Sequence, residues 1–279
     1  MQDILTCAMG LDIHRDVIVA CLAKGELGTD PEIEIRSFST LIPEMRKLRD
    51  WVLEAECRYV AMESTGIYWQ PIYEMLEPCF DGQINILVVN ARHMKNVPGR
   101  KTDMRDAQWI ATLLRAGLLK GSFIPDKTFR ELRHLTRYRK SIVRDITAQK
   151  NRIDKFLQSS GFRFTAFLSD AFGASGRNII RHLMEYGNIS REALDRCLKT
   201  QTRKRIDEIL IALNGSLSEH QRGFLRMIFG HLEALEQHRH TVEDAITKEI
   251  TKHEEALSLL CSIPGIDVTA AAAIIAEIG

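Results

Sequence analysis

Short apolar segments near the start of the chain follow one another in an order that few folds accommodate. Two of them, ILTCAMGLDI and VIVACLAK, are separated only by HRD, so they predict a β-hairpin. A third strand is predicted at EIEIRSFS, where apolar and polar residues alternate. A helix is then predicted from Pro43 to about Cys57, followed by a strand at RYVAMEST, a helix at IYWQPIYEML and a strand at INILVVN. Three antiparallel strands followed by α/β units predict an α/β fold with a mixed sheet.

This order of elements is that of the ribonuclease-H-like fold, and four acidic residues occupy places where such a fold needs metal ligands. Asp12 lies inside the first apolar strand and Glu63 at the end of a later one. Asp103 and Asp106 lie in KTDMRDAQWIATLL, which predicts a helix with Thr102 as its N-cap. Clustered carboxylates repel one another unless a hard cation neutralises them. The four residues are therefore predicted to be catalytic ligands of Mg²⁺ that act on a phosphodiester.

Each of these acids also has a structural explanation when it is taken alone. Asp12 suits the cap of a turn, and Glu63 suits an exposed strand end. Asp103 and Asp106 suit the first turn of a helix, where the dipole favours negative charge. The placement of all four on successive α/β elements favours the metal site. Nearby groups predicted to orient water or phosphate are His14, Ser64, Thr65, Lys101 and Arg105.

A basic helical pattern follows the acidic residues, from Lys127 to about Gln158. Its apolar stripe comprises Leu132, Leu135, Ile142, Ile146 and Ile153. Residues 120–155 hold eleven Lys and Arg against four acids, a surplus of seven that suits nucleic-acid phosphates, although a solvated helix face is the commoner explanation. The predicted nucleic-acid contacts are Lys101, Arg105, Arg130, Arg133, Arg137, Arg139, Lys140 and Arg144.

The remainder of the chain is predicted to be helical. Short helices are expected over 177–215 and one long helix from Ser218 to about Leu260. Long helices of this kind pair within a chain or with a second subunit. The last segment, SIPGIDVTAAAAIIAEIG, is similar to a helix-hairpin-helix DNA-binding element, although a plain helix turn is the alternative. The predicted domains are an acidic ribonuclease-H-like domain at 1–125, a helical, coiled-coil-like linker at 126–255, and the start of a truncated further domain at 256–279.

Bulk composition sets limits on where the protein works. The net charge of the 279 residues is only +1, so a nucleic-acid surface must be local. Six cysteines are scattered without CxxC spacing, which favours a reducing cytoplasm. No signal peptide and no apolar segment of membrane-spanning length is visible, so a membrane partner is not expected.

Four stretches carry a family resemblance: GLDIHRDVIVACL, AMESTGIYWQPIYEML, NARHMKNVPGRKTDMRDAQWIATLLRAGLL and SIPGIDVTAAAAIIAEIG. Together they resemble the DEDD transposases of bacterial insertion sequences, in the insertion-sequence-110 group. The four acids fall on the quartet of that family, which binds Mg²⁺. The resemblance implies a resolvase-like domain, recombination of DNA guided by a structured RNA, and a homo-oligomer (a dimer or tetramer).

The resemblance also implies a serine nucleophile in a C-terminal domain, downstream of the motif with which this chain ends. Ser262 precedes the Pro-Gly turn and does not match that serine. The chain is therefore expected to hold the metal half of a composite site without the nucleophile. Two alternatives stay open: a self-sufficient endonuclease of the Holliday-junction type, and a non-catalytic nucleic-acid-binding remnant.

Overall fold

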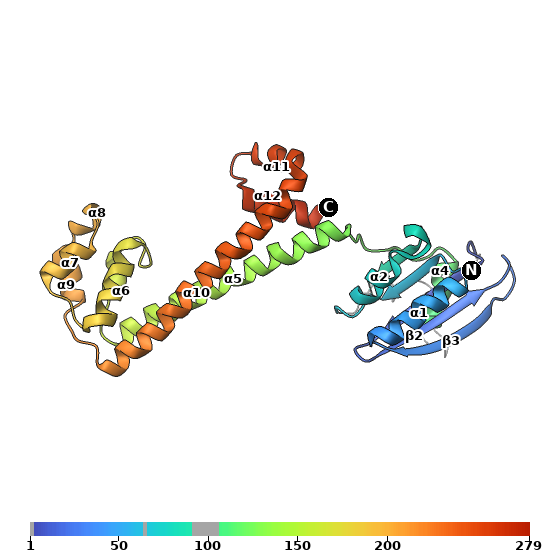
Figure 1. The fold of residues 1–279 in the computed structure, drawn as a ribbon, viewed down its shortest axis with the longest axis horizontal. Coiled ribbons are helices and arrows are strands. Elements are labelled where there is room, and N and C mark those ends of the chain that lie inside the picture. The colour runs from blue at the N-terminus through green and yellow to red at the C-terminus, as the bar shows by residue number, and fades with distance from the viewer. Residues whose placement is uncertain (1–2, 64–65, 91–105) are drawn as a thin grey trace. The chain divides into compact units, whose positions relative to one another are not determined.

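The computed structural model describes residues 3–63, 66–90 and 106–279, and the chain forms two compact units (Figure 1). The first unit is Met1–Ile124 and the second is Pro125–Gly279. Several residues singled out in the sequence lie outside the described ranges, namely Ser64, Thr65, Lys101, Thr102, Asp103 and Arg105.

A five-stranded mixed sheet forms the centre of the first unit, as the sequence predicts. Its strands, in chain order, are β1 (Cys7–Ile13), β2 (Val17–Lys24), β3 (Glu32–Ser39), β4 (Tyr59–Glu63) and β5 (Asn85–Val89). They lie in the order β3-β2-β1-β4-β5. The pairs β1–β2 and β2–β3 are antiparallel, whereas β1–β4 and β4–β5 are parallel. This arrangement confirms the α/β class and is consistent with a ribonuclease-H-like fold.

Helices cover both faces of this sheet, which explains why its central strands are buried on both sides. They are α1 (Ile42–Glu54), α2 (Gln70–Leu76) and α4 (Asp106–Arg115), with a 3₁₀ turn at Cys79–Gly82. The face carrying Met9 and Leu11 packs with α1 and α2 in one apolar cluster. The opposite face carries small residues and packs against α4. The predicted first helix stops three residues short of Cys57, because Glu56 adopts a positive φ of 54°.

Two long antiparallel helices dominate the second unit (Figure 1). They are α5 (Lys127–Ser159) and α10 (Glu219–Ile250), and α10 begins with a capping box between Ser218 and Gln221. The side chain of Gln149 is buried between them and donates a hydrogen bond to the carbonyl of Ile228 at 2.6 Å. The predicted apolar stripe of α5 is buried here, except that Leu135 is only partly buried. The two long helices therefore pair within the chain.

Shorter helices complete the second unit. They are a 3₁₀ turn at Phe164–Phe167, α6 (Ala174–Tyr186), α7 (Arg191–Cys197), α8 (Thr200–Arg203), α9 (Ile206–Ala212), a 3₁₀ turn at Thr251–His253, α11 (Glu254–Cys261) and α12 (Val268–Ile278). The expectation of one helix from Ser218 to Leu260 is wrong, because His253 leaves the helical conformation (φ −123°, ψ 41°). The ring of His253 stacks on Phe129 of α5 with centroids 4.5 Å apart, which stabilises the break.

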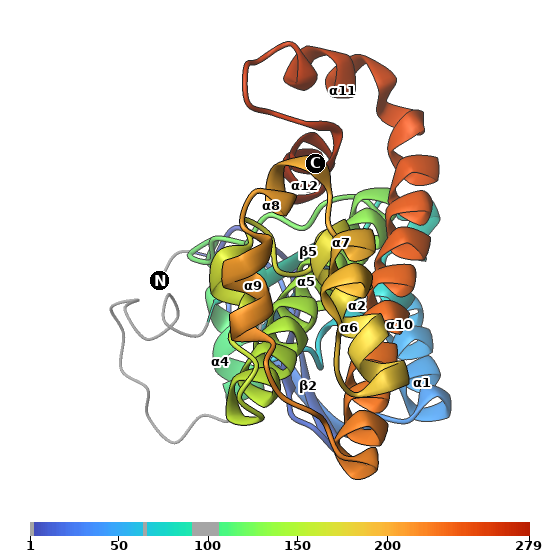
Figure 2. The ribbon, with the colours of Figure 1, turned by 90° about the vertical axis from the view of Figure 1, so that its left-hand side faces the viewer.

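The final helix packs back onto the start of the long pair. Figure 2 shows the chain turning from α11 into α12 after α10 has ended. Ala272, Ile275 and Ala276 of α12 are buried in the same apolar cluster as α5 and α10. Residues 256–279 thus belong to the compact second unit. No helix in the described ranges is both long enough and apolar enough to cross a bilayer.

Candidate functional site

The parallel pairing of β1 and β4 brings two of the predicted acidic ligands together. Leu11 is aligned with Met62, so Asp12 and Glu63 are the next residues along the two strands. Neighbouring strands lie about 4.8 Å apart, and residues in register point to the same face. Glu63 is in turn aligned with Val89 of β5. Asp12 and Glu63 therefore leave the sheet side by side at the carboxyl ends of two parallel strands.

Alternation along the strands identifies the face that these carboxylates occupy. A Cβ placed on Gly10 would lie 2.2 Å from the carbonyl oxygen of Ala107 and 2.4 Å from the nitrogen of Ala111, so Gly10 faces α4. Asp12 lies two residues further along β1 and therefore points to this same face. Ala61 packs against α4, and Glu63 follows it at the same spacing. Both acids accordingly face the side of the sheet that α4 covers.

The first turn of α4 lies toward the same end of the sheet. Ala8 packs with Ile110 and Leu114 of α4, whereas Gly10 meets Ala107 and Ala111. The carboxyl end of β1, where Asp12 lies, is therefore next to the N-terminus of α4, where Asp106 is exposed. Position 10 requires glycine, because any larger residue would push this turn of α4 away from the strand. The fold thus directs Asp12, Glu63 and Asp106 to one edge.

A histidine accompanies the first of these acids. Nε2 of His14 lies 3.1 Å from Oδ2 of Asp12. The side chain of Asp12 is 16% exposed and that of His14 is 61% exposed, so the pair lies at the border between protein and solvent. A protonated His14 donates to the carboxylate and competes with any cation for the same oxygen. His14 is one of the groups predicted from sequence to accompany the acids.

The donor set suits a hard divalent cation, because carboxylate oxygens are the ligands that Mg²⁺ prefers. Within residues 3–63, 66–90 and 106–279, however, no three His, Cys, Asp or Glu side chains lie close enough to hold a metal ion. Asp103, the fourth predicted ligand, lies outside those ranges. The described geometry therefore shows that Asp12, Glu63 and Asp106 are directed to the same edge of the sheet. The kind of ion that would suit them follows from the chemistry of their carboxylate oxygens.

Sequence reasoning missed a buried arginine at the far end of α4. The side chain of Arg115 is 1% exposed. Its Nε donates to the carbonyl of Leu5 at 3.0 Å, its Nη2 donates to that of Glu26 at 2.8 Å, and its Nη1 lies 3.4 Å from Oδ2 of Asp3. Arg115 therefore joins the end of α4 to the start of the chain and to the β2–β3 connection. The available signal was a lone arginine in the apolar stretch IATLLRAGLL.

The predicted nucleic-acid contacts on α5 differ in what they touch. Arg133 and Arg137 bind the end of α12, and Arg139 binds Glu243 of α10 at 2.7 Å. Arg130 donates to the carbonyl of Pro125 at 2.9 Å. Lys140 and Arg144 are exposed and make no hydrogen bond or ion pair among the described residues. Some of the residues predicted to bind nucleic acid, namely Arg133, Arg137 and Arg139, therefore form contacts within the protein.

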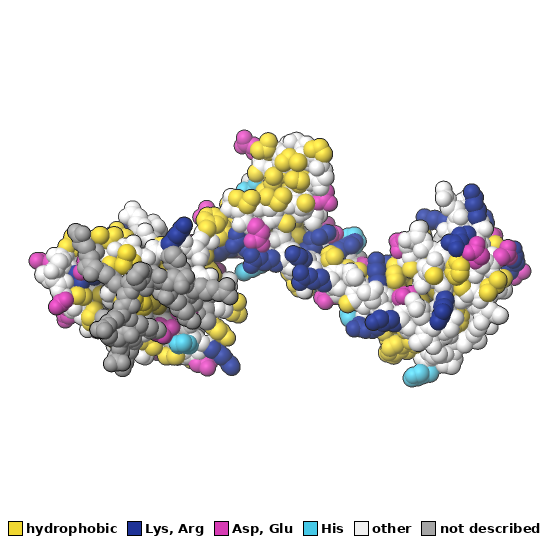
Figure 3. Space-filling view, turned by 180° about the vertical axis from the view of Figure 1, so that it is seen from behind, with side chains coloured by type: hydrophobic (Ala, Val, Ile, Leu, Met, Phe, Trp, Pro, Cys, Tyr) yellow, Lys and Arg dark blue, Asp and Glu magenta, His cyan; other side chains and the backbone are white. Residues whose placement is uncertain are grey.

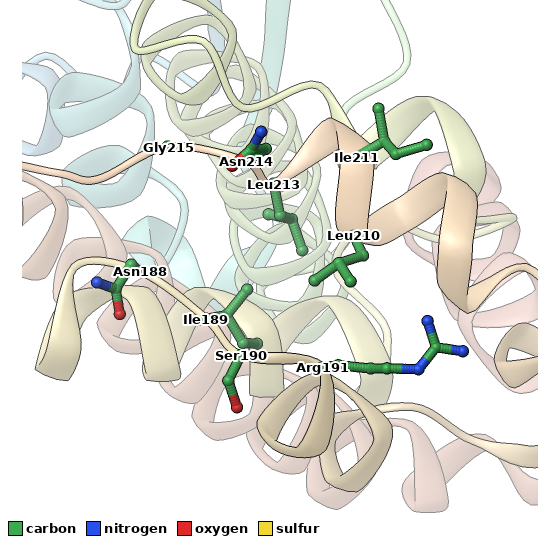
Figure 4. A pocket seen from close by; sticks show the side chains of 9 residues that line it. All are labelled: Asn188, Ile189, Ser190, Arg191, Leu210, Ile211, Leu213, Asn214 and Gly215. Carbon is green, nitrogen blue, oxygen red and sulfur yellow. The ribbon is translucent and has the colours of Figure 1, made fainter.

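A cavity of about 640 Å³ lies in the second unit between the start of α7 and the end of α9. Ile189, Leu210 and Leu213 point toward one another within it, whereas Arg191 points away (Figure 4). Arg191 donates a hydrogen bond to Asp207, so its charge is already compensated. The cavity is open, and its lining residues form no cluster of reactive side chains.

Comparison with known proteins assigns the chain to a family. A family model described as a transposase, of the DEDD type of IS110 elements, matches residues 9–161, more than half of the chain. The match runs from β1 to the residues just after α5, and it includes Asp12, Glu63, Asp103 and Asp106. No curated protein matches the sequence. The chain therefore belongs to the DEDD transposase family of IS110 insertion sequences.

Proposed function

We propose that the chain acts on DNA during transposition through a divalent metal, Mg²⁺, held by Asp12, Glu63, Asp103 and Asp106. The observation that supports this most is the register of β1 and β4, which sets Asp12 beside Glu63 on the face covered by α4. Carboxylate oxygens directed to one edge are the donors that a hard divalent cation binds. When bound, the metal supplies charge stabilisation for the phosphodiester oxygens.

The chain's own residues define the remaining roles. Asp12 and Glu63 are fixed by strands, and Asp106 by a helix that packs tightly on Gly10, so the ligands are held by rigid elements. His14 holds the Asp12 carboxylate in a defined orientation at 3.1 Å. Ser262 receives no nucleophilic role, because its hydroxyl donates to the carbonyl of Leu259 at 2.7 Å at the end of α11.

The proposed partners follow from the family and from local charge. DNA is the substrate of a transposase, and Lys101, Arg105 and the basic residues of α5 are proposed to bind its phosphates. A structured guide RNA and a second copy of the chain are further proposed partners. The domain assignment is likewise a proposal, with an acidic catalytic domain at 1–125, a helical linker at 126–255, and a C-terminal segment at 256–279 that packs on the long helices.

A metal-binding measurement tests the acidic site. Calorimetric titration is expected to show that Asp12→Asn binds Mn²⁺ at least about tenfold more weakly than wild type, because one charged ligand is removed. Asp16→Asn is the matched control, since Asp16 lies in the adjacent turn with its side chain 84% exposed. Equal Mn²⁺ affinity in wild type and Asp12→Asn would contradict the proposal.

DNA assays separate the alternatives. With Mg²⁺ and a four-way junction, cleavage by wild type that is lost in Asp12→Asn would favour a self-sufficient endonuclease. DNA binding that falls steeply with salt but does not respond to Mg²⁺ would favour a non-catalytic nucleic-acid binder. The proposed transposase predicts a third result, in which Mg²⁺ alters DNA binding through Asp12 and this chain alone does not cut the junction.

A further inference from the structure

Four cations of α5 form a continuous stripe on one side of the helix. Arg133, Arg137, Lys140 and Arg144 are separated by four, three and four residues, the spacing of side chains that share a helix face. This cationic stripe extends over about 16 Å of helix. The nearest acids of α5 in sequence are Glu131 and Asp145, and at 100° per residue both fall on other faces. Figure 3 shows Lys and Arg side chains gathered along the long helices next to the α11–α12 hairpin.

One carboxylate from the last helix occupies the first half of the stripe. The Nε and Nη2 of Arg137 donate to Oε1 and Oε2 of Glu277 at 2.8 and 2.9 Å. Arg133 donates to the backbone carbonyls of Ala276 and Glu277 at 2.9 Å each. The bidentate contact between Arg137 and Glu277 has the geometry with which arginine also binds phosphate.

The stripe holds more positive charge than Glu277 neutralises. The hydrogen bond from Arg137 lowers the pKa of the Glu277 carboxyl, and the charges of Arg137, Arg133 and Lys140 act in the same direction. Lys140 and Arg144 are exposed and have no hydrogen-bond or ion-pair partner among the described residues. Glu243 of α10 is bound by Arg139, which lies outside the stripe. Four cations therefore share a single carboxylate.

We propose that the cationic stripe binds the phosphate backbone of duplex DNA and that Glu277 of α12 occupies the Arg137 position until a phosphate displaces it. This inference rests on the DNA-binding part of the proposed function and adds a residue that controls it. Duplex DNA is the favoured occupant because the chain belongs to a transposase family. Arg and Lys side chains are also among the groups that most often contact the phosphates of a duplex.

The contacts of the two arginines suit them to different tasks. The side chains of Arg137 and Glu277 are 62% and 46% exposed, and solvent screens such a pair, so it exchanges readily for a phosphate. The side chain of Arg133 is only 18% exposed. Its Nε lies 3.3 Å from Oε2 of Glu277, but it also donates to the carbonyls of Ala276 and Glu277, which a phosphate does not replace. Arg133 therefore keeps α12 on α5, while Arg137 exchanges its anion. Displacement frees the Glu277 side chain without undocking the helix.

The test is a titration of fluorescent duplex DNA with the intact chain at several salt concentrations, in EDTA so that the acidic edge does not contribute. Glu277→Gln is expected to bind roughly threefold more tightly than wild type at every salt concentration, because no carboxylate has to leave Arg137 before a phosphate binds it. Glu255→Gln is the control for net charge, because Glu255 is exposed on α11 and makes no hydrogen bond or ion pair among the described residues. The double variant Glu277→Gln/Arg137→Gln is expected to lose the gain.

Three results would overturn the inference. The first is an equal gain in Glu277→Gln and Glu255→Gln, and the second is a gain that persists without Arg137. The third is a gain with duplex RNA but not with duplex DNA, which would remove the assigned occupant. Because the titration excludes divalent metal, failure of the carboxylate site in the Mn²⁺ experiment leaves this result unchanged. Absence of DNA binding by both wild type and Glu277→Gln would overturn this inference together with the DNA contacts proposed for α5. Circular dichroism of each variant checks that the helices are retained.

Discussion

Ion pairs join neighbouring helices in the second unit, whereas strand register and helix packing direct three carboxylates to one edge in the first unit. Between the helices of the second unit, Arg177 binds Glu236 at 2.6 Å and Arg139 binds Glu243 at 2.7 Å. In the first unit, strand register and the packing of α4 direct Asp12, Glu63 and Asp106 toward the same end of the sheet.

The comparison shows how to separate structural charge from functional charge. An arginine in a buried or half-buried pair with a glutamate on the next helix, such as Arg139 with Glu243, has its partner within the fold, so its presence in a basic segment is weak evidence for a ligand. The acids of the first unit are instead placed at one edge by strand register and helix packing, which is how rigid elements hold the ligands of a metal site.

Replacement of Arg115 with methionine is expected to have the largest effect on stability. The change leaves the carbonyls of Leu5 and Glu26 without their donor and removes the charge that faces Asp3. Each acceptor that loses its donor costs about 1–3 kcal/mol. Arg137→Gln in the second unit is expected to cost less than about 1 kcal/mol, because its ion pair is exposed.

Urea unfolding distinguishes the two units. The tryptophans Trp51, Trp69 and Trp109 all lie in the first unit, so their fluorescence reports on it, while far-ultraviolet dichroism reports mainly on the long helices. Arg115→Met is expected to shift the fluorescence transition far more than Arg137→Gln shifts the dichroism transition. Shifts of similar size would contradict the distinction between buried and exposed charge.

Glycine-to-alanine changes are expected to have opposite signs in the two units. Gly10→Ala places a Cβ 2.2 Å from the Ala107 carbonyl oxygen, so α4 must move and stability falls by about 1–3 kcal/mol. Gly223→Ala in α10 meets no atom within 4 Å and is expected to stabilise by about 0.5–1 kcal/mol. Thermal unfolding followed by fluorescence and dichroism measures both, and a neutral Gly10→Ala would show that α4 is not closely packed there.

The smallest expected effect is the pH dependence of the contact between α12 and α5. The hydrogen bond from Arg137 lowers the folded-state pKa of Glu277 below its ordinary value of 4.5. The contact therefore stabilises the fold above the pKa of the unfolded chain, and this stabilisation is lost as pH falls through the lower folded value. The difference in unfolding midpoint between wild type and Glu277→Gln is expected to shrink from pH 7 to pH 3. A difference of equal size at both pH values would show that carboxylate charge is not responsible.

The sequence predicted what depends on local pattern. The mixed sheet and the pairing of the long helices were expected because apolar residues repeat at strand or helix spacing. The contacts of Arg115 could not be predicted, because Leu5 and Glu26 lie 110 and 89 residues away. The same holds for Glu277, which lies 140 residues from Arg137. That Asp12 and Glu63 lie near each other could be predicted from the sequence, because both fall on strands that are neighbours in the sheet. Asp103 lies outside the described residues.

Cleavage of the protein backbone by bound iron is the most direct test of the acidic edge. Fe²⁺ substituted for Mg²⁺ and treated with ascorbate and peroxide produces hydroxyl radicals that cut the chain near the ion. A metal shared by the four carboxylates predicts cuts close to Asp12, Glu63 and the segment from Asp103 to Asp106 at once, all suppressed by excess Mg²⁺ and absent in Asp12→Asn. Cuts at only one of these segments, or cuts that Mg²⁺ does not suppress, would show that the carboxylates do not share a metal.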